Sequence, residues 1–121
     1  MSFGVIGIDH VQIAVPRAKE AECLVFYRAL LGPCEITKPV ELRARGGAWF
    51  QLANMQLHIG LDAEASPPSK RHICILVDDL AHPRALAESQ GVAVEEESEV
   101  DGLRRFFVRD PAGNRIEITQ R

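Results

Sequence analysis

Hydrophobic and polar residues alternate along several short stretches of this chain. The segment 7–15, GIDHVQIAV, has a period of two, and the segment 72–77, HICILV, repeats the pattern in the second half. This period is typical of a β-strand with one buried face. Each segment is followed by apolar residues at helical spacing that end at a glycine, so we expect helices within 16–32 and 78–91.

Shorter apolar stretches follow each predicted helix, and turn-forming residues separate them. After the first helix, we expect one short strand near 35–37 and two strands within 48–61, joined at Ala53-Asn54. After the second helix, we expect strands at 92–98, 103–108 and 114–119. The segment 110–114, DPAGN, has the proline and glycine chemistry of a tight turn between the last two.

Both halves therefore have the order strand, helix, three strands. This repetition predicts an α+β fold with two tandem βαβββ modules that form a curved, cleft-enclosing mixed sheet with the helices outside. We place the first module at about 5–62 and the second at about 70–121. The polar, proline-bearing segment 63–69 is the predicted linker, and the whole chain, 1–121, is expected to form one domain.

The last strand of each half carries a polar residue at a matched distance from an aromatic residue. We align the halves on Phe50 and Phe107. His58 follows Phe50 by eight residues and Glu117 follows Phe107 by ten, and the longer DPAGN turn accounts for the difference. His58 and Glu117 are therefore predicted to occupy equivalent positions.

These two residues and the histidines of the two first strands, His10 and His72, are all metal-ligand types. In each strand the apolar residues that would pack under a helix alternate with them, so all four are expected on the face away from the helices. Three imidazoles and one carboxylate suit a divalent ion such as Zn²⁺, Ni²⁺, Fe²⁺, Co²⁺ or Mn²⁺. Two alternatives remain: hydrogen-bonded structural histidines, and a metal-free cleft with polar walls. His82 precedes a proline in the second helix and is given no role.

Composition and charge narrow the function classes. The chain has 121 residues and a formal net charge of −3, with acidic and basic residues interleaved, which disfavours nucleic acid as a partner. No apolar run is long enough to cross a membrane, and no secretory signal is recognisable. The three cysteines have no metal or disulfide spacing, so we expect a soluble protein of the reducing cytoplasm.

Five stretches together resemble the vicinal oxygen chelate superfamily, which includes glyoxalase I, extradiol dioxygenases, fosfomycin-modifying enzymes and bleomycin-binding proteins. They are DHVQIAV, FYRALLG, WFQLANMQLHI, HICILVDDL and RRFFVRDPAGNRIEI. The resemblance covers nearly the whole chain. It implies the βαβββ pair and metal ligands at His10, His58, His72 and Glu117. It also implies a homodimer in which His10 and His58 of one subunit meet the other two ligand positions of its partner, although a cleft within one chain stays open.

The resemblance implies a function through one divalent metal ion. The leading hypothesis is a glyoxalase-like lyase or isomerase that chelates neighbouring oxygens of a small metabolite, with Glu117 moving a proton. Glyoxalase I would have a carboxylate or similar group in place of His58. The alternatives are a ring-cleaving dioxygenase, a fosfomycin-type thiol transferase, for which a tyrosine is not matched at Phe106 or Phe107, and a metal-free sequestering protein.

Further residues share the strand register of the four ligand positions and could line a substrate pocket. Gln12 and Arg115 are expected either in the pocket or on a solvated sheet face. Cys74 fits a small buried packing position better. Trp49 could form the floor of an apolar substrate site, but packing in the core or in a dimer interface is favoured. Gln56 completes the set of pocket candidates.

Overall fold

A computed structural model describes residues 3–64 and 67–121 of the chain, so part of the predicted linker lies outside the described residues. The first half contains β1 (His10–Pro16), α1 (Glu20–Leu31), β2 (Glu35–Ile36), β3 (Ala48–Leu52) and β4 (Met55–Asp62). The second half contains β5 (His72–Val77), α2 (Ala81–Ser89), β6 (Glu95–Glu96), β7 (Arg105–Arg109) and β8 (Arg115–Gln120). Among these residues, no helix is long and apolar enough to span a membrane.

The two halves form two four-stranded mixed sheets with the same topology. The N-terminal sheet has the order β1-β4-β3-β2 and the C-terminal sheet has the order β5-β8-β7-β6. In each sheet the first strand of the half pairs in parallel with the last, and the remaining pairs are antiparallel. The α+β class and the repeated strand–helix–three-strand order are thus confirmed.

Element boundaries differ from the prediction mainly at strand ends. The first strand begins at His10, and a 3-10 turn at 17–19 separates it from α1. The predicted strand at 92–98 is reduced to Glu95 and Glu96. Val92 and Val94 pack against the core outside any strand, and the acidic residues after them are exposed and gain no apolar burial in a longer strand.

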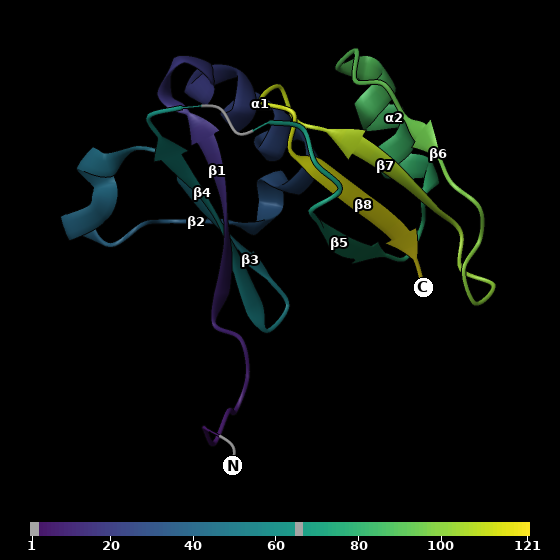
Figure 1. Ribbon diagram of the computed structural model, residues 1–121, viewed down its shortest axis with the longest axis horizontal. Helices are drawn as coiled ribbons and strands as arrows, with labels where there is room; N and C mark the ends of the chain where they lie inside the picture. The colour runs from purple at the N-terminus through teal and green to yellow at the C-terminus, as the bar shows by residue number, and fades with distance from the viewer. Residues whose placement is uncertain (1–2, 65–66) are drawn as a thin grey trace.

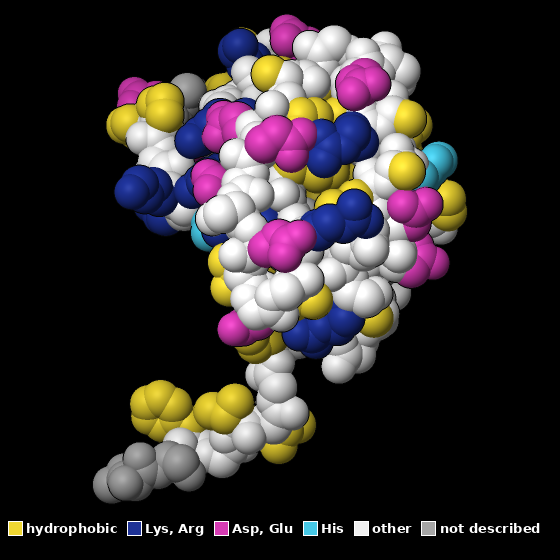
Figure 2. Space-filling view, turned by 90° about the vertical axis from the view of Figure 1, so that its right-hand side faces the viewer, with side chains coloured by type: hydrophobic (Ala, Val, Ile, Leu, Met, Phe, Trp, Pro, Cys, Tyr) yellow, Lys and Arg dark blue, Asp and Glu magenta, His cyan; other side chains and the backbone are white. Residues whose placement is uncertain are grey.

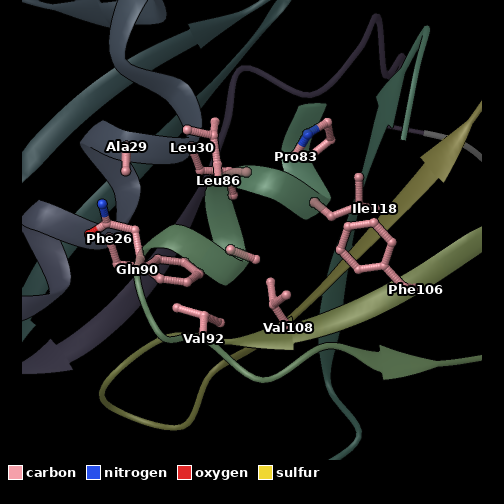
Figure 3. A pocket seen from close by; sticks show the side chains of 11 residues that line it. Phe26, Ala29, Leu30, Pro83, Leu86, Gln90, Val92, Phe106, Val108 and Ile118 are labelled. Carbon is pink, nitrogen blue, oxygen red and sulfur yellow. The ribbon is translucent and has the colours of Figure 1, made fainter. Parts of the chain in front are cut away.

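The sequence predicted helices on the outside of the sheets, and this prediction is wrong. In the structure α1 lies between the two sheets and contacts α2 (Figure 1). Side chains from α1, α2 and the C-terminal sheet, among them Phe26, Leu86 and Phe106, meet around a small apolar cavity of about 20 Å³ (Figure 3). This volume is close to that of a single water molecule, so the cavity is a packing gap. The core therefore joins the two halves through their helices.

A polar contact also joins the halves at the predicted DPAGN turn. Asp110 is 4% exposed and accepts a hydrogen bond from the Tyr27 hydroxyl of α1 at 2.7 Å. Burial first, and then the negative charge of Asp110, raise the pKa of Tyr27 well above its usual value, so the hydroxyl keeps its proton. From the same turn, Asn114 Nδ2 donates to the carbonyl oxygen of Ala14 in β1 at 3.1 Å. The turn thus fixes the orientation of the two sheets.

Candidate functional site

All four predicted ligand positions lie on the sheet faces away from the helices. In β4, the neighbours of His58, Leu57 and Ile59, are each 1% exposed in the core, and in β8 the neighbours of Glu117, Ile116 and Ile118, are fully buried. Strand alternation therefore turns His58 and Glu117 to the opposite face. This part of the sequence-based prediction is confirmed.

The pairing register shows that His58 and Glu117 occupy equivalent positions. His58 pairs with Gln12, two residues after His10, and Glu117 pairs with Cys74, two residues after His72. The alignment of the two halves on Phe50 and Phe107, however, is wrong by one residue. On the third strand, Trp49 pairs with His58 and Phe107 pairs with Glu117, so Trp49 rather than Phe50 is the counterpart of Phe107.

We call His10 and His58 the N-terminal half-site. Their rings are stacked with centroids 4.2 Å apart, and Trp49 stacks on the other face of His58 at 3.8 Å and an interplanar angle of 3°. Trp49 therefore packs against the half-site rather than in the core. The nitrogen lone pairs of stacked imidazoles lie in parallel planes, so one ion can bind both rings only after at least one of them rotates.

Hydrogen bonds orient the two imidazoles of this half-site. His10 Nδ1 lies 2.8 Å from Asp9 Oδ2, and His58 Nε2 lies 2.9 Å from Gln56 Oε1. Both oxygens are acceptors, which assigns the ring protons to these nitrogens and leaves His10 Nε2 and His58 Nδ1 as lone-pair donors. A carboxylate behind a ligating histidine is the arrangement common in metal sites.

His58 is 5% exposed and is held in its neutral form. Burial, followed by the proximity of His10, lowers the pKa of His58 from its usual value of 6.5. A neutral imidazole is the form that binds a metal ion, so His58 requires no proton release at pH 7.

We call His72 and Glu117 the C-terminal half-site. His72 Nδ1 lies 2.8 Å from the carbonyl oxygen of Lys70, and His72 Nε2 lies 3.1 Å from Glu117 Oε1. The carbonyl can only accept, so it directs the first proton of the ring to Nδ1. The lone pairs of Nε2 and Oε1 then face each other, and a cation between them, either a proton or a metal ion, relieves their repulsion.

The carboxylate of Glu117 is surrounded by groups that favour its charged form. Thr119 Oγ1 donates to Oε2 at 2.7 Å, and the Cys74 thiol lies 3.4 Å from the same oxygen. Burial by itself raises the pKa of Glu117, but these hydrogen bonds and the charges of Arg105 and His72 outweigh it, so that the pKa is lowered from 4.5. Glu117 is therefore ionised at neutral pH, as a metal ligand must be.

The two half-sites do not meet within one chain. Among residues 3–64 and 67–121, no three His, Cys, Asp or Glu side chains are close enough to hold one ion. A hollow of about 440 Å³ lies beside the N-terminal half-site and is also lined by Lys38 and Arg45. A separate hollow of about 320 Å³ lies beside His72. Each half-site thus opens to its own surface cavity.

The other pocket candidates are placed as follows. Gln12 is exposed and lines both hollows, and Gln56 supports His58. Cys74 is exposed on the sheet face beside Glu117, which contradicts the buried packing position favoured from the sequence. Arg115 lies with its guanidinium carbon 3.6 Å from the Phe107 ring centroid and 15% of its side chain exposed.

Sequence reasoning missed several groups that support the candidate ligands. Asp9 precedes His10 directly, and an acidic residue beside a ligand-type histidine was a usable signal. Thr119 shares the strand face of Glu117 at a spacing of two, which alternation could have revealed. Arg105 reaches Glu117 Oε1 at 3.4 Å from the neighbouring strand, and no local pattern indicates that contact.

Comparisons with known proteins agree with this fold. Residues 7–118 match the family model described as Glyoxalase/Bleomycin resistance protein/Dioxygenase superfamily. A crystal structure described as a glyoxalase family protein from Bacillus anthracis is 38% identical, with a TM-score of 0.85 over 99% of this chain and 98% of that chain. No curated protein shows significant sequence similarity to this chain.

Structures of the fosfomycin resistance protein FosX from Listeria monocytogenes are also similar. One is 16% identical, with a TM-score of 0.76 over 97% of this chain and 94% of that chain. A mutant FosX complexed with Mn(II) and 1S,2S-dihydroxypropylphosphonic acid is 16% identical, with a TM-score of 0.73 over 94% of this chain and 89% of that chain. At this identity the likeness concerns the fold alone.

Proposed function

Because the chain belongs to the Glyoxalase/Bleomycin resistance protein/Dioxygenase superfamily, we propose that it is a divalent-metal-dependent lyase or isomerase of the glyoxalase type acting on a small oxygenated metabolite. The observation that carries this proposal is the pair of half-sites. Four ligand-type side chains occupy equivalent positions of two repeated sheets, and the hydrogen bonds of the three imidazoles to acceptor oxygens leave one nitrogen lone pair on each ring for a metal ion.

The proposed metal site is shared between two subunits of a homodimer. The N-terminal half-site of one subunit supplies His10 and His58, and the C-terminal half-site of the other supplies the equivalents of His72 and Glu117. Neither half-site alone has the three or four protein ligands that divalent metal sites usually contain. Two such sites, related by the dimer axis, would use every half-site once.

The donor set fits a borderline divalent ion. Three imidazoles and one carboxylate suit Zn²⁺, Ni²⁺, Fe²⁺, Co²⁺ or Mn²⁺, and the described FosX structure contains Mn(II). Such an ion, when bound, polarises neighbouring oxygens of a substrate and stabilises negative charge as it develops on them.

Within the proposed site, His10 and His58 would hold the ion, and Glu117 would hold or move a proton. Thr119 and the Cys74 thiol engage Glu117 Oε2, and His72 and Arg105 lie at Oε1, so Oε1 can accept a proton only after these two groups move away from it. The lowered pKa makes Glu117 a weak base. Its proton transfer therefore requires separation from Arg105 and His72, whose charges stabilise the carboxylate.

A second candidate function is modification of a phosphonate such as fosfomycin. Lys38 and Arg45 line the hollow beside the N-terminal half-site, where two cationic side chains suit an anionic substrate group. The FosX complex contains a dihydroxypropylphosphonic acid, which supports the same substrate chemistry. Ring cleavage of a catechol has no comparable support from the described residues.

Metal binding is expected to change the fluorescence of Trp49, which is the only tryptophan of the chain. His58 stacks on the Trp49 indole, and coordination requires ring rotation in the His10–His58 pair, so the environment of the indole changes. Titration of chelator-treated protein with Mn²⁺ or Ni²⁺ measures this change. Because the pKa of His58 is lowered from its usual value, the response should persist at pH 6.5 and weaken only at more acidic pH, where the protonated imidazole no longer binds metal.

The titration has a matched control and an independent check. His82→Ala removes the one histidine outside the half-sites and should leave the response unchanged. Elemental analysis gives the number of ions per chain. The metal content could be near zero and stay there after Mn²⁺, Ni²⁺, Zn²⁺ or Fe²⁺ is added. That result would contradict the proposed metal-dependent enzyme and favour a metal-free sequestering protein.

The reaction class is tested by turnover with metal-loaded protein. We expect conversion of methylglyoxal–thiol adducts, and Glu117→Gln should lower kcat by at least about 100-fold, the scale of general acid–base catalysis. Thr119→Val keeps the carboxylate and should lower kcat less. Turnover of fosfomycin alone would favour the second candidate, and oxidation of catechols alone would assign a dioxygenase.

A further inference from the structure

The segment 3–9, which we call the arm, leaves the body of the protein before β1 and carries four large apolar side chains. Phe3 is 97% exposed, Val5 73%, Ile6 104% and Ile8 67%. In Figure 1 the chain extends away from the N-terminal sheet at this point, and Figure 2 shows hydrophobic side chains on the extension below the body of the molecule.

Single exposed apolar residues are common on protein surfaces, but four within six positions on a projecting segment are not. The body of the protein gives none of these four side chains appreciable cover. Val25 and Val40, in contrast, are isolated exposed valines of α1 and of the segment 40–45. A surface outside the chain is therefore needed to bury the arm.

We infer that the arm packs on a second copy of this chain, along the outer edge of its strand β5. The arm leads directly into His10, and it is anchored there because the Gln56 amide donates to the carbonyl oxygen of Asp9 at 3.1 Å. This docking place rests on the proposed shared metal site, which brings the first residue of the second subunit's β5 next to His10.

The outer edge of β5 has backbone groups and an exposed apolar side chain that could cover the arm. β5 is the first strand of the C-terminal sheet and pairs only with β8, so its outer edge has free backbone groups among the described residues. Leu76 on this strand is 54% exposed and is one of the few large apolar side chains exposed outside the arm. An edge strand of this kind is a ready surface for a second extended segment.

The register of the two segments is compatible. Leu76 lies four residues after His72, and Ile6 lies four residues before His10. If the arm runs antiparallel to β5 from the shared ion, Ile6 of one subunit comes level with Leu76 of the partner subunit. Ile6 and Leu76 are each an even number of residues from the histidine of their own segment. In an extended pair of segments, their side chains therefore lie on the same face as the two histidines.

The test compares dimer dissociation in the full chain without metal, so that a shared ion cannot hold the subunits together. The arm variant combines Phe3→Ser, Ile6→Ser and Ile8→Ser. We expect sedimentation equilibrium to give a dimer Kd at least about 100-fold above wild type. Each dimer contains two arms, and the variant loses the apolar burial of both. Leu76→Ser should also weaken the dimer, by about 10-fold or more.

The control variant combines Val25→Ser and Val40→Ser. These valines are also exposed, at 60% and 66%, but lie outside the arm, so the Kd should change by less than about threefold. An arm variant that dimerises like wild type, or a wild-type chain that is monomeric, overturns the inference. Binding of a monomeric wild type to phosphatidylcholine vesicles, lost in the arm variant, also overturns it and assigns the arm to lipid.

The metal titration of the wild-type protein separates this inference from the proposed function. A dimer that depends on the arm but binds no metal contradicts only the proposed function. A dimer that binds metal and has an unchanged Kd in the arm variant contradicts only the role of the arm.

Discussion

Mixing two variants that do not bind metal is expected to restore metal binding. His58→Ala disables the N-terminal half-site, and Glu117→Gln disables the C-terminal half-site. Each variant alone should bind Mn²⁺ or Ni²⁺ at least about 100-fold more weakly than wild type, at or beyond the upper end of the losses seen when only a supporting residue is removed. After the two chains are unfolded together and refolded, about one quarter of the wild-type sites should return.

The expected fraction follows from a site shared across a symmetric dimer. About half of the randomly formed dimers contain one chain of each kind, and in such a dimer one site has both damaged halves while the other is intact. Within a single chain no mixture could rebuild a site, because every chain carries a lesion. Calorimetric titration of the mixture measures the number of sites.

The control mixes two variants of the same half-site, His10→Ala and His58→Ala. No intact N-terminal half-site exists in any dimer of this mixture, so binding should not return. Recovery in the control, or no recovery in the His58 and Glu117 mixture of folded dimers, would contradict the shared site.

Asp110→Ala is expected to lower the free energy of unfolding by about 3–5 kcal/mol, because several buried hydrogen bonds to a carboxylate are lost and each contributes about 1.5–3 kcal/mol at most. The Asp110 carboxylate accepts from Tyr27, from the amides of Ala112 and Asn114 at 2.9 Å each, and from Asn114 Nδ2 at 2.9 Å. Alanine leaves these donors without their acceptor in the region that joins the two halves. Urea denaturation followed by circular dichroism measures the change.

Two matched variants separate this effect from the loss of a surface charge. Tyr27→Phe removes only the hydroxyl and should cost about 1–2 kcal/mol. Asp78→Ala removes an exposed aspartate near the start of α2 and should change stability by less than about 0.5 kcal/mol. If Asp110→Ala were no more destabilising than Asp78→Ala, the turn would not hold the two halves together.

Much of the candidate site could be predicted because it depends on local patterns. Strand alternation predicts the face on which His58 and Glu117 lie, and the repeated element order makes them equivalent. The error at Phe50 has an equally local cause. The alignment assigned a difference of two residues to the longer turn. The paired residues are nine apart from Trp49 to His58 and ten apart from Phe107 to Glu117, so the true difference is one residue.

Local patterns are sufficient to predict the α+β class, the duplicated βαβββ order, the two strand faces and the four ligand-type positions, because periods of two and 3.6 residues are properties of short segments. The tertiary structure was needed to show that α1 lies between the sheets and that His10 and His58 do not join His72 and Glu117 around one ion within a single chain. These relations depend on how the helices pack and on the Tyr27–Asp110 contact, between residues distant in sequence. Strand periodicity carries no information about such contacts. Local sequence patterns therefore predict each half-site, but the position of one half-site relative to the other depends on how the two halves pack.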